Sequence, residues 1–323
     1  MAGHAVEHDY HLIPPSPWPF LSGISALVWG LGMVTFFAGL VQRTGDNPMM
    51  EWFFASGFDT VQASATGVDA ATTNGGWIIL LIGCIMAVFV MYGWWRDVAR
   101  ESEAGDHTPV VDIGLRYGMI MFIMQEAMFF VGLFWMFFEL GFFKEKRAEW
   151  NTDILENASE YATSMAPGVT SVDAFNLPLI NTLILLLSGT TVTWAHHALI
   201  HNDRKGAKWG LFLTVALGIL FTFFQAVEYL ELFHAREAGH EAWINADVYG
   251  SAFFMATGFH GFHVLIGTIF LAVCWLRMLK GGLKSEKHFG LEAAAWYWHF
   301  VDVVWLFLFA FVYIVFATGG GAH

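Results

Sequence analysis

Seven apolar segments, each about twenty or more residues long, dominate this sequence and are separated by shorter polar stretches. A helix of about twenty apolar residues spans the hydrocarbon core of a bilayer, and lipid forces each spanning backbone to satisfy its own hydrogen bonds. A water-soluble fold would have to bury all seven segments, and a chain of 323 residues cannot do so. We therefore predict an all-α integral membrane protein with transmembrane helices at Trp18–Val41, Trp77–Trp95, Tyr117–Phe143, Leu177–Ile200, Trp209–Phe233, Val248–Leu276 and Ala293–Ala317.

The composition supports the same class of protein. Only 13% of the residues are charged, whereas soluble domains carry about 25%. Tryptophan or tyrosine stands at many of the predicted helix ends, as in the aromatic belts of membrane proteins: Trp18, Trp77, Trp94, Trp95, Tyr117 and Trp209.

The distribution of basic residues predicts the orientation of the chain. Ten of the fifteen Lys and Arg residues fall in 96–116, 202–208 and 277–288, which share one side of the membrane with the N-terminal tail. The positive-inside rule therefore places the N-terminus on the inner side and the C-terminus outside. Residues 1–17 lack the basic start of a signal peptide, so we expect them to lead directly into the first helix. Two long polar connections, 43–76 and 144–176, then lie outside.

Glu126 is the strongest functional candidate inside a predicted span. About ten apolar residues flank it on either side, and an ionisable group at such depth is costly. The cost of a buried charge favours the protonated, neutral carboxyl. Two interpretations follow: a group that exchanges protons or gates a path, or a neutral acid hydrogen-bonded to a neighbouring helix.

The other intramembrane polar residues favour structural roles. His260 and His263 are spaced i, i+3 on one helix face, and so are His299 and Asp302. Metal binding needs three or four converging ligands, and haem needs an axial ligand, so hydrogen bonding between helices is the commoner use of such pairs. Glu228 lies deep in the fifth span, where we expect it to pair with a histidine or tyrosine.

The inner end of the second span combines aromatic and basic residues. Trp94 and Trp95 precede Arg96, and Arg100 with Glu101 follows one turn later. A stacking surface and a guanidinium fork are what a phospholipid headgroup requires. Ordinary anchoring at the interface explains the same residues equally well.

Several of these stretches together resemble subunit III of the haem–copper cytochrome c oxidases. The matching stretches are PSPWP at 15–19, WWRDVARE at 94–101, GLRYG at 114–118, TWAHH at 193–197, FMATGFHGFH at 254–263, AWYWHFVDVVW at 295–305 and the segment around Glu126. They touch six of the seven spans, and the polar residues keep their spacing.

The resemblance implies a fold and a role. It implies a single membrane domain over 1–323, with a tail and two-helix bundle in 1–105, a five-helix bundle in 106–323, and a V-shaped phospholipid cleft between the bundles. It also implies a subunit that binds no haem or copper and packs mainly against subunit I, beside subunit II. The partner subunits carry haem a and copper, and the complex oxidises cytochrome c, reduces oxygen and pumps protons. Subunit III supports proton uptake and protects the complex during turnover.

The resemblance also assigns residues. Glu126 matches the family's buried carboxyl, and the predicted lipid site comprises Trp94, Trp95, Arg100, Glu101, His107 and Arg277. Gly281 and Gly282 depart from the more polar stretch usual there. The long outer connections point to a bacterial plasma-membrane enzyme.

Three alternatives remain open on the sequence alone. The first is subunit III of a ubiquinol oxidase, although those members typically have five helices. The second is an independent transporter that uses Glu126, against which no inverted repeat is visible. The third is a membrane cytochrome with His260 or His299 as an axial ligand.

Overall fold

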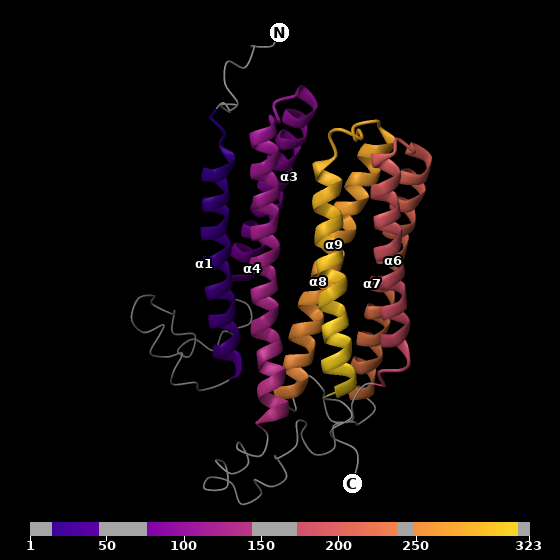
Figure 1. The fold of residues 1–323 in the computed structure, drawn as a ribbon. Coiled ribbons are helices and arrows are strands. Elements are labelled where there is room, and N and C mark those ends of the chain that lie inside the picture. The colour runs from indigo at the N-terminus through magenta and orange to yellow at the C-terminus, as the bar shows by residue number, and fades with distance from the viewer. Residues whose placement is uncertain (1–14, 45–75, 144–172, 238–247, 316–323) are drawn as a thin grey trace, which may run out of the picture. The chain divides into compact units, whose positions relative to one another are not determined.

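The computed structural model describes residues 15–44, 76–143, 173–237 and 248–315. Regular structure in these ranges is helical, apart from one isolated bridge between Lys284 and Lys287. The helices are α1 (Trp18–Thr44), α3 (Gly76–Ala104), α4 (Pro109–Phe142), α6 (Leu177–Ile200), α7 (Arg204–Glu237), α8 (Val248–Leu279) and α9 (Phe289–Phe307), and α9 continues as the π-helix η3 (Leu308–Val315) (Figure 1).

Seven helices in the described ranges are long and apolar enough to cross a membrane, which confirms the predicted number and the all-α class. Several helices are longer than predicted. The second helix continues nine residues past Trp95, the fifth begins at Arg204, and the seventh begins at Phe289. Hydropathy locates the part of a helix that lies in hydrocarbon, whereas the backbone hydrogen bonds continue into the polar interface.

The connections between helices are correspondingly shorter than predicted. Most of 96–116 is helical, with a break only at residues 105–108 between α3 and α4. Most of the outer connections 43–76 and 144–176 lies outside the described residues. The chain divides into two compact units, residues 1–111 and 112–323, which are described separately below.

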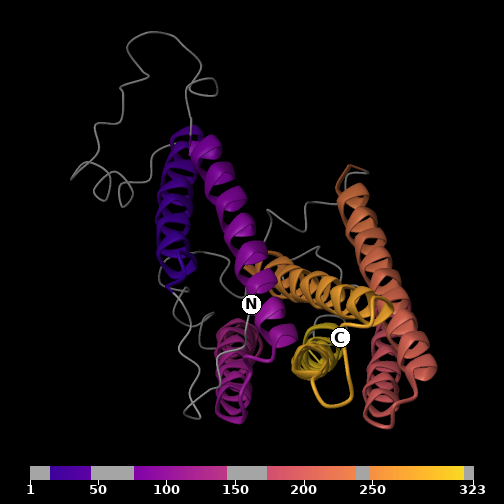
Figure 2. The same cartoon turned by 90° about the horizontal axis from the view of Figure 1, so that it is seen from above.

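In the first unit, α1 and α3 pack as an antiparallel pair (Figures 1 and 2). A side chain at Gly83 would overlap the backbone of Trp29, so this glycine lets the two backbones approach closely. At the inner end predicted above, the indole Nε1 of Trp18 donates a hydrogen bond of 2.8 Å to Oδ2 of Asp97.

In the second unit, α6 packs against α7, α7 against α8, and α8 against α9, while α6 also contacts α9 (Figure 2). The connections of α6 to α7 and of α8 to α9 are short, so these neighbours are antiparallel. The side chains of Trp298, Trp305 and Phe221 fill the centre and are fully buried.

Buried polar groups in this core are paired across helices. The indole of Trp298 donates to Oγ of Ser188, and the indole of Trp305 donates to Oγ1 of Thr182, each over 2.9 Å. Both bonds join α9 to α6. Because lipid offers no replacement partner, such bonds favour one register between the two helices.

Candidate functional site

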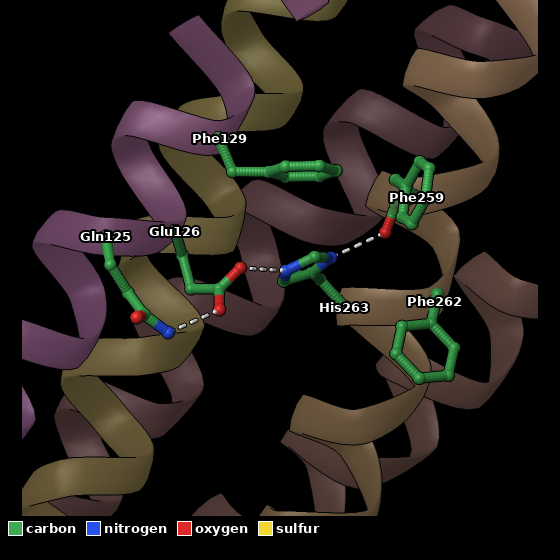
Figure 3. A pocket seen from close by; sticks show the side chains of 6 residues that line it. All are labelled: Gln125, Glu126, Phe129, Phe259, Phe262 and His263. Carbon is green, nitrogen blue, oxygen red and sulfur yellow. Dashed lines mark hydrogen bonds and ion pairs between the residues drawn. The ribbon is translucent and has the colours of Figure 1, made fainter. Parts of the chain in front are cut away.

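The candidate site lies between α4 and α8, where Glu126 and His263 point toward each other (Figure 3). They line a cavity of about 440 Å³ together with Gln125, Phe129, Phe259 and Phe262. The side chains of Glu126 and His263 are 19% and 9% exposed, so both are largely buried in the protein.

The hydrogen bonds of the histidine fix how many protons the pair holds. Nδ1 of His263 lies 2.6 Å from the carbonyl oxygen of Phe259, which can only accept, so Nδ1 carries a proton. Nε2 lies 2.9 Å from Oε2 of Glu126. One further proton occupies this contact, either on the carboxyl beside a neutral imidazole or on Nε2 beside a carboxylate. The pair is neutral overall in both forms, which avoids an isolated charge in the membrane.

The surroundings of the pair are mostly aromatic. Phe129 stacks on the His263 ring at 6.5 Å between centroids, Tyr297 stacks on it at 6.3 Å, and Phe130 meets it edge-on at 5.0 Å. A polar neighbour is also present: Nε2 of Gln125 donates to Oε1 of Glu126 over 3.1 Å. The low polarity of this shell strengthens the carboxyl–imidazole hydrogen bond.

The sequence analysis treated Glu126 as a functional candidate and His263 as a structural polar residue, and the structure brings the two side chains into contact. The sequence also put His260 and His263 on one helix face, but their partners differ. Nε2 of His260 faces the carbonyl oxygen of Val301 on α9 at 3.2 Å, and the ring is fully buried. Positions i and i+3 differ by about 60° around a helix axis, which is enough to meet two different neighbours.

A second carboxyl–imidazole pair lies within α9. Nδ1 of His299 is 3.6 Å from Oδ2 of Asp302, and Nε2 is 3.0 Å from Oγ1 of Thr193 on α6. Asp302 is buried, whereas the His299 side chain is 46% exposed. This pair therefore joins a buried acid to the surface of the helix bundle.

Glu228 has a tyrosine partner, one of the two kinds expected from the sequence. The hydroxyl of Tyr313 donates to Oε1 of Glu228 over 2.8 Å, and Nε2 of Gln225 approaches Oε2 at 3.4 Å. Both neighbours donate to the carboxyl, which is 2% exposed. Glu228 thus joins α7 to the end of the seventh span.

An ion pair that the sequence analysis missed joins the starts of α4 and α9. The guanidinium of Arg116 binds Glu292 through both carboxylate oxygens, at 3.0 and 3.2 Å. Part of the signal was in the sequence, because Arg116 and Glu292 directly precede the predicted spans that begin at Tyr117 and Ala293 and carry opposite charges. Nothing in the sequence showed that these two ends are adjacent.

The predicted lipid-site residues lie in both units. Trp94 and Trp95 are exposed on α3, and the exposed guanidinium of Arg100 lies 3.7 Å from Asp97. Glu101 and His107 are partly buried nearby in the chain, at the end of α3 and in the connection that follows. Arg277 belongs to the second unit, in the last turn of α8. A single headgroup site that includes all six residues stays a prediction.

Metal-ligating residues do not cluster in the part of the chain that the structure describes: no three His, Cys, Asp or Glu side chains there come together as a metal site requires.

Fold and site together define a seven-helix membrane protein whose helices are joined by carboxyl, imidazole and hydroxyl groups. A family model described as "Cytochrome c oxidase subunit III" matches residues 49–317, and the chain belongs to this family. Proteins named "Cytochrome c oxidase subunit 3" are similar over nearly the whole length. The one from Dugong dugon is 43% identical over 310 residues, covering 95% of this chain and 97% of the relative. The one from Drosophila melanogaster is 43% identical over 315 residues, covering 97% and 98%.

Membership makes this chain a non-catalytic subunit of an oxidoreductase complex of the respiratory chain. It confirms the family expected from the sequence motifs. The transporter, membrane cytochrome and ubiquinol oxidase alternatives are not favoured. These two relatives come from animals, so the bacterial origin stays a prediction.

Proposed function

We propose that this chain supports proton uptake by its oxidase through the shared proton of Glu126 and His263. The observation that carries the proposal is the 2.9 Å contact between Oε2 of Glu126 and Nε2 of His263. The other ring nitrogen, Nδ1, already donates to the carbonyl oxygen of Phe259. The proton in this contact can move between the two groups without creating a net charge. A hydrogen bond that only holds two helices together needs no proton exchange, because a tyrosine or an amide side chain could make it in place of the carboxyl group.

The experiment replaces the exchangeable proton and keeps the hydrogen bond. In Glu126→Gln, the amide N–H can donate to Nε2 of a neutral His263, so assembly is preserved while the proton can no longer transfer. We expect the variant complex to form in normal yield and to take up protons severalfold more slowly after a pulse of oxygen, measured with a pH indicator in the external medium.

Glu228→Gln is the matched control, because it makes the same chemical change at a buried carboxyl that only accepts hydrogen bonds. We expect wild-type uptake in that variant. Wild-type uptake in Glu126→Gln as well would leave the pair with a structural role only.

The complex around the chain follows from the family. We propose that subunit I is its main contact, beside subunit II, that haem a and copper reside in those partners, and that cytochrome c donates the electrons. Purification of the tagged chain in mild detergent tests this proposal. Co-purifying copper subunits, haem a absorbance in the reduced-minus-oxidised spectrum and oxidation of reduced cytochrome c would support it. A colourless single chain would contradict it.

The proposed location is the plasma membrane of a bacterium, with the N-terminus inside and the C-terminus outside. The length of the connections 43–76 and 144–176 supports the bacterial membrane. The location of ten of the fifteen basic residues on one side of the seven spans supports the orientation. Thiol labelling of Lys205→Cys, from either side of sealed vesicles, distinguishes the two orientations: labelling from the cytoplasmic side supports the proposal, and labelling from the outer side contradicts it.

A bound phospholipid is the second part of the proposed function. Exposed Trp94 and Trp95 offer an aromatic surface, and the nearby Arg100 is largely exposed. Guanidinium groups bind phosphate through paired hydrogen bonds. We propose that Arg100 and Arg277 hold the headgroup, with Glu101 and His107 beside it.

A further inference from the structure

The His299 side chain is 46% exposed on the surface of a membrane-spanning helix. Its helix begins at Phe289 and continues through η3 to Val315. His299 lies about 15 Å from the first residue of this 27-residue span, which is longer than the roughly 30 Å thickness of the hydrocarbon. This places an exposed imidazole within the hydrocarbon region of the membrane.

The hydrogen bonds around His299 leave acceptors in excess. The hydroxyl of Thr193 donates to the carbonyl oxygen of Gly189 at 2.9 Å, so its oxygen accepts from Nε2–H of His299. A neutral ring then has only an acceptor at Nδ1. This nitrogen faces the Asp302 carboxyl at 3.6 Å, which is too long for a hydrogen bond.

Asp302 adds a further unsatisfied acceptor. Its Oδ1 is buried and has no hydrogen-bond partner among the described residues, while the residue is 6% exposed. A buried acceptor without a donor is destabilising, and an exposed imidazole facing hydrocarbon is as well. Lipid tails cannot supply the missing donor.

The surroundings of this polar group are apolar and suit a second helix. Leu187 and Trp194 on α6 and Val303 on α9 are exposed. Val303 lies one turn from His299 on α9, and Trp194 directly follows Thr193 on α6, so the polar group adjoins apolar surface of the kind that a transmembrane helix covers. The polar centre requires a hydrogen-bond donor at the same depth, which a lipid acyl chain lacks.

We propose that the face of α6 and α9 around His299, Thr193 and Asp302 is the docking surface for a transmembrane helix of another oxidase subunit. That helix presents a hydroxyl, amide or cationic donor at the depth of His299. The inference rests on the proposed function, because it requires the chain to reside in the complex. It goes further by assigning the face and the chemistry of the contact.

The experiment uses a photo-crosslinking amino acid, p-benzoylphenylalanine, in the full complex in native membranes. Val303 is exposed one turn from His299, and Phe223 on α7 is a matched exposed position elsewhere. We expect Val303→p-benzoylphenylalanine to crosslink to a membrane span of another oxidase subunit, identified by peptide mass spectrometry. We expect the substitution at Phe223 to yield lipid adducts.

Two outcomes would overturn the inference. One is that the probe at Val303 forms adducts only with lipid, with this chain or with a second copy of it. The other is that crosslinks to another subunit form at Phe223 and not at Val303. Co-purification of the other subunits with the wild-type chain is measured first. If it fails, the proposed function fails; if it succeeds and Val303 meets only lipid, the docking inference alone fails.

A second measurement tests the polar complement. His299→Phe keeps a flat ring but removes both nitrogens, so we expect roughly three- to tenfold greater loss of the other subunits during detergent washing, as for one lost interhelical hydrogen bond. His299→Gln keeps an acceptor and should retain most of the association. Equal retention in both variants would show that the polar contact contributes nothing.

Discussion

At the scale of single residues, the buried acids fall into two chemical kinds. Glu126 and Asp302 each face an imidazole whose other nitrogen already donates. A proton is shared only at Glu126, because Nδ1 of His299 is 3.6 Å from Asp302, which is too long for a hydrogen bond. Glu228 receives donors from Tyr313 and Gln225 and only accepts. Position within an apolar span singled out all three acids. The i, i+3 spacing already pointed from Asp302 to His299 on the same helix. The particular partners of Glu126 and Glu228 could not be predicted, because they depend on the rotation and register of neighbouring helices.

The ion pair of Arg116 and Glu292 gives a prediction at this scale. In Arg116→Ala, the Glu292 carboxylate, whose side chain is 16% exposed when the pair is intact, loses its bidentate partner. We expect the complex to lose about 1–3 kcal/mol of stability, toward the lower end because Arg116 is 44% exposed. Thermal unfolding of the purified complex measures the change.

The double variant Arg116→Ala with Glu292→Ala provides the control. Removing both charges should be less harmful than removing Arg116 alone, because no unpaired carboxylate remains. If the two substitutions are simply additive, the pair contributes no coupling energy and this prediction is wrong.

At the scale of helices, hydropathy predicted what the bilayer determines. All seven spans were found, and Leu177–Ile200 was predicted to the residue. The errors lie where helices leave the hydrocarbon: α3 runs on to Ala104, and α4 begins at Pro109. Polar helix ends carry no hydropathy signal, so their bounds depend on backbone hydrogen bonds that the apolar pattern does not encode.

The packing of α1 on α3 gives a prediction at this scale. Any side chain at Gly83 meets the backbone of Trp29, so Gly83→Ala should push the two helices apart. We expect a loss of about 1–3 kcal/mol, the usual effect of overpacking. Gly118→Ala on α4 is the matched control, since a methyl group there meets nothing within 4 Å.

Limited proteolysis of the purified complex measures the effect. Fragments cut between α1 and α3 should accumulate faster for Gly83→Ala, and Gly118→Ala should behave as wild type. Equal cleavage of both variants would contradict close packing at Gly83.

At the scale of the whole molecule, the family could be predicted from short polar motifs, because their spacing is not imposed by a generic apolar helix. Seven short stretches carried the resemblance, and all but the first, at 15–19, lie within residues 49–317, which the family model matches. The docking face around His299 could not be predicted in the same way. It depends on which side of a packed bundle remains exposed, and only the packed second unit reveals that half of the imidazole is uncovered.

The predicted lipid site belongs to this scale because its residues come from both units. Arg100→Ala combined with Arg277→Ala removes two guanidinium groups that would bind one phosphate, so we expect the purified complex to lose bound phospholipid and to inactivate sooner during turnover. Lipid mass spectrometry per complex and the decay of oxygen consumption measure the two effects. Arg96→Ala is the control, since Arg96 is exposed on the same helix and lies 3.5 Å from Asp97. If the double variant kept its full phospholipid content, the headgroup role of these arginines would be refuted, whatever its catalytic lifetime.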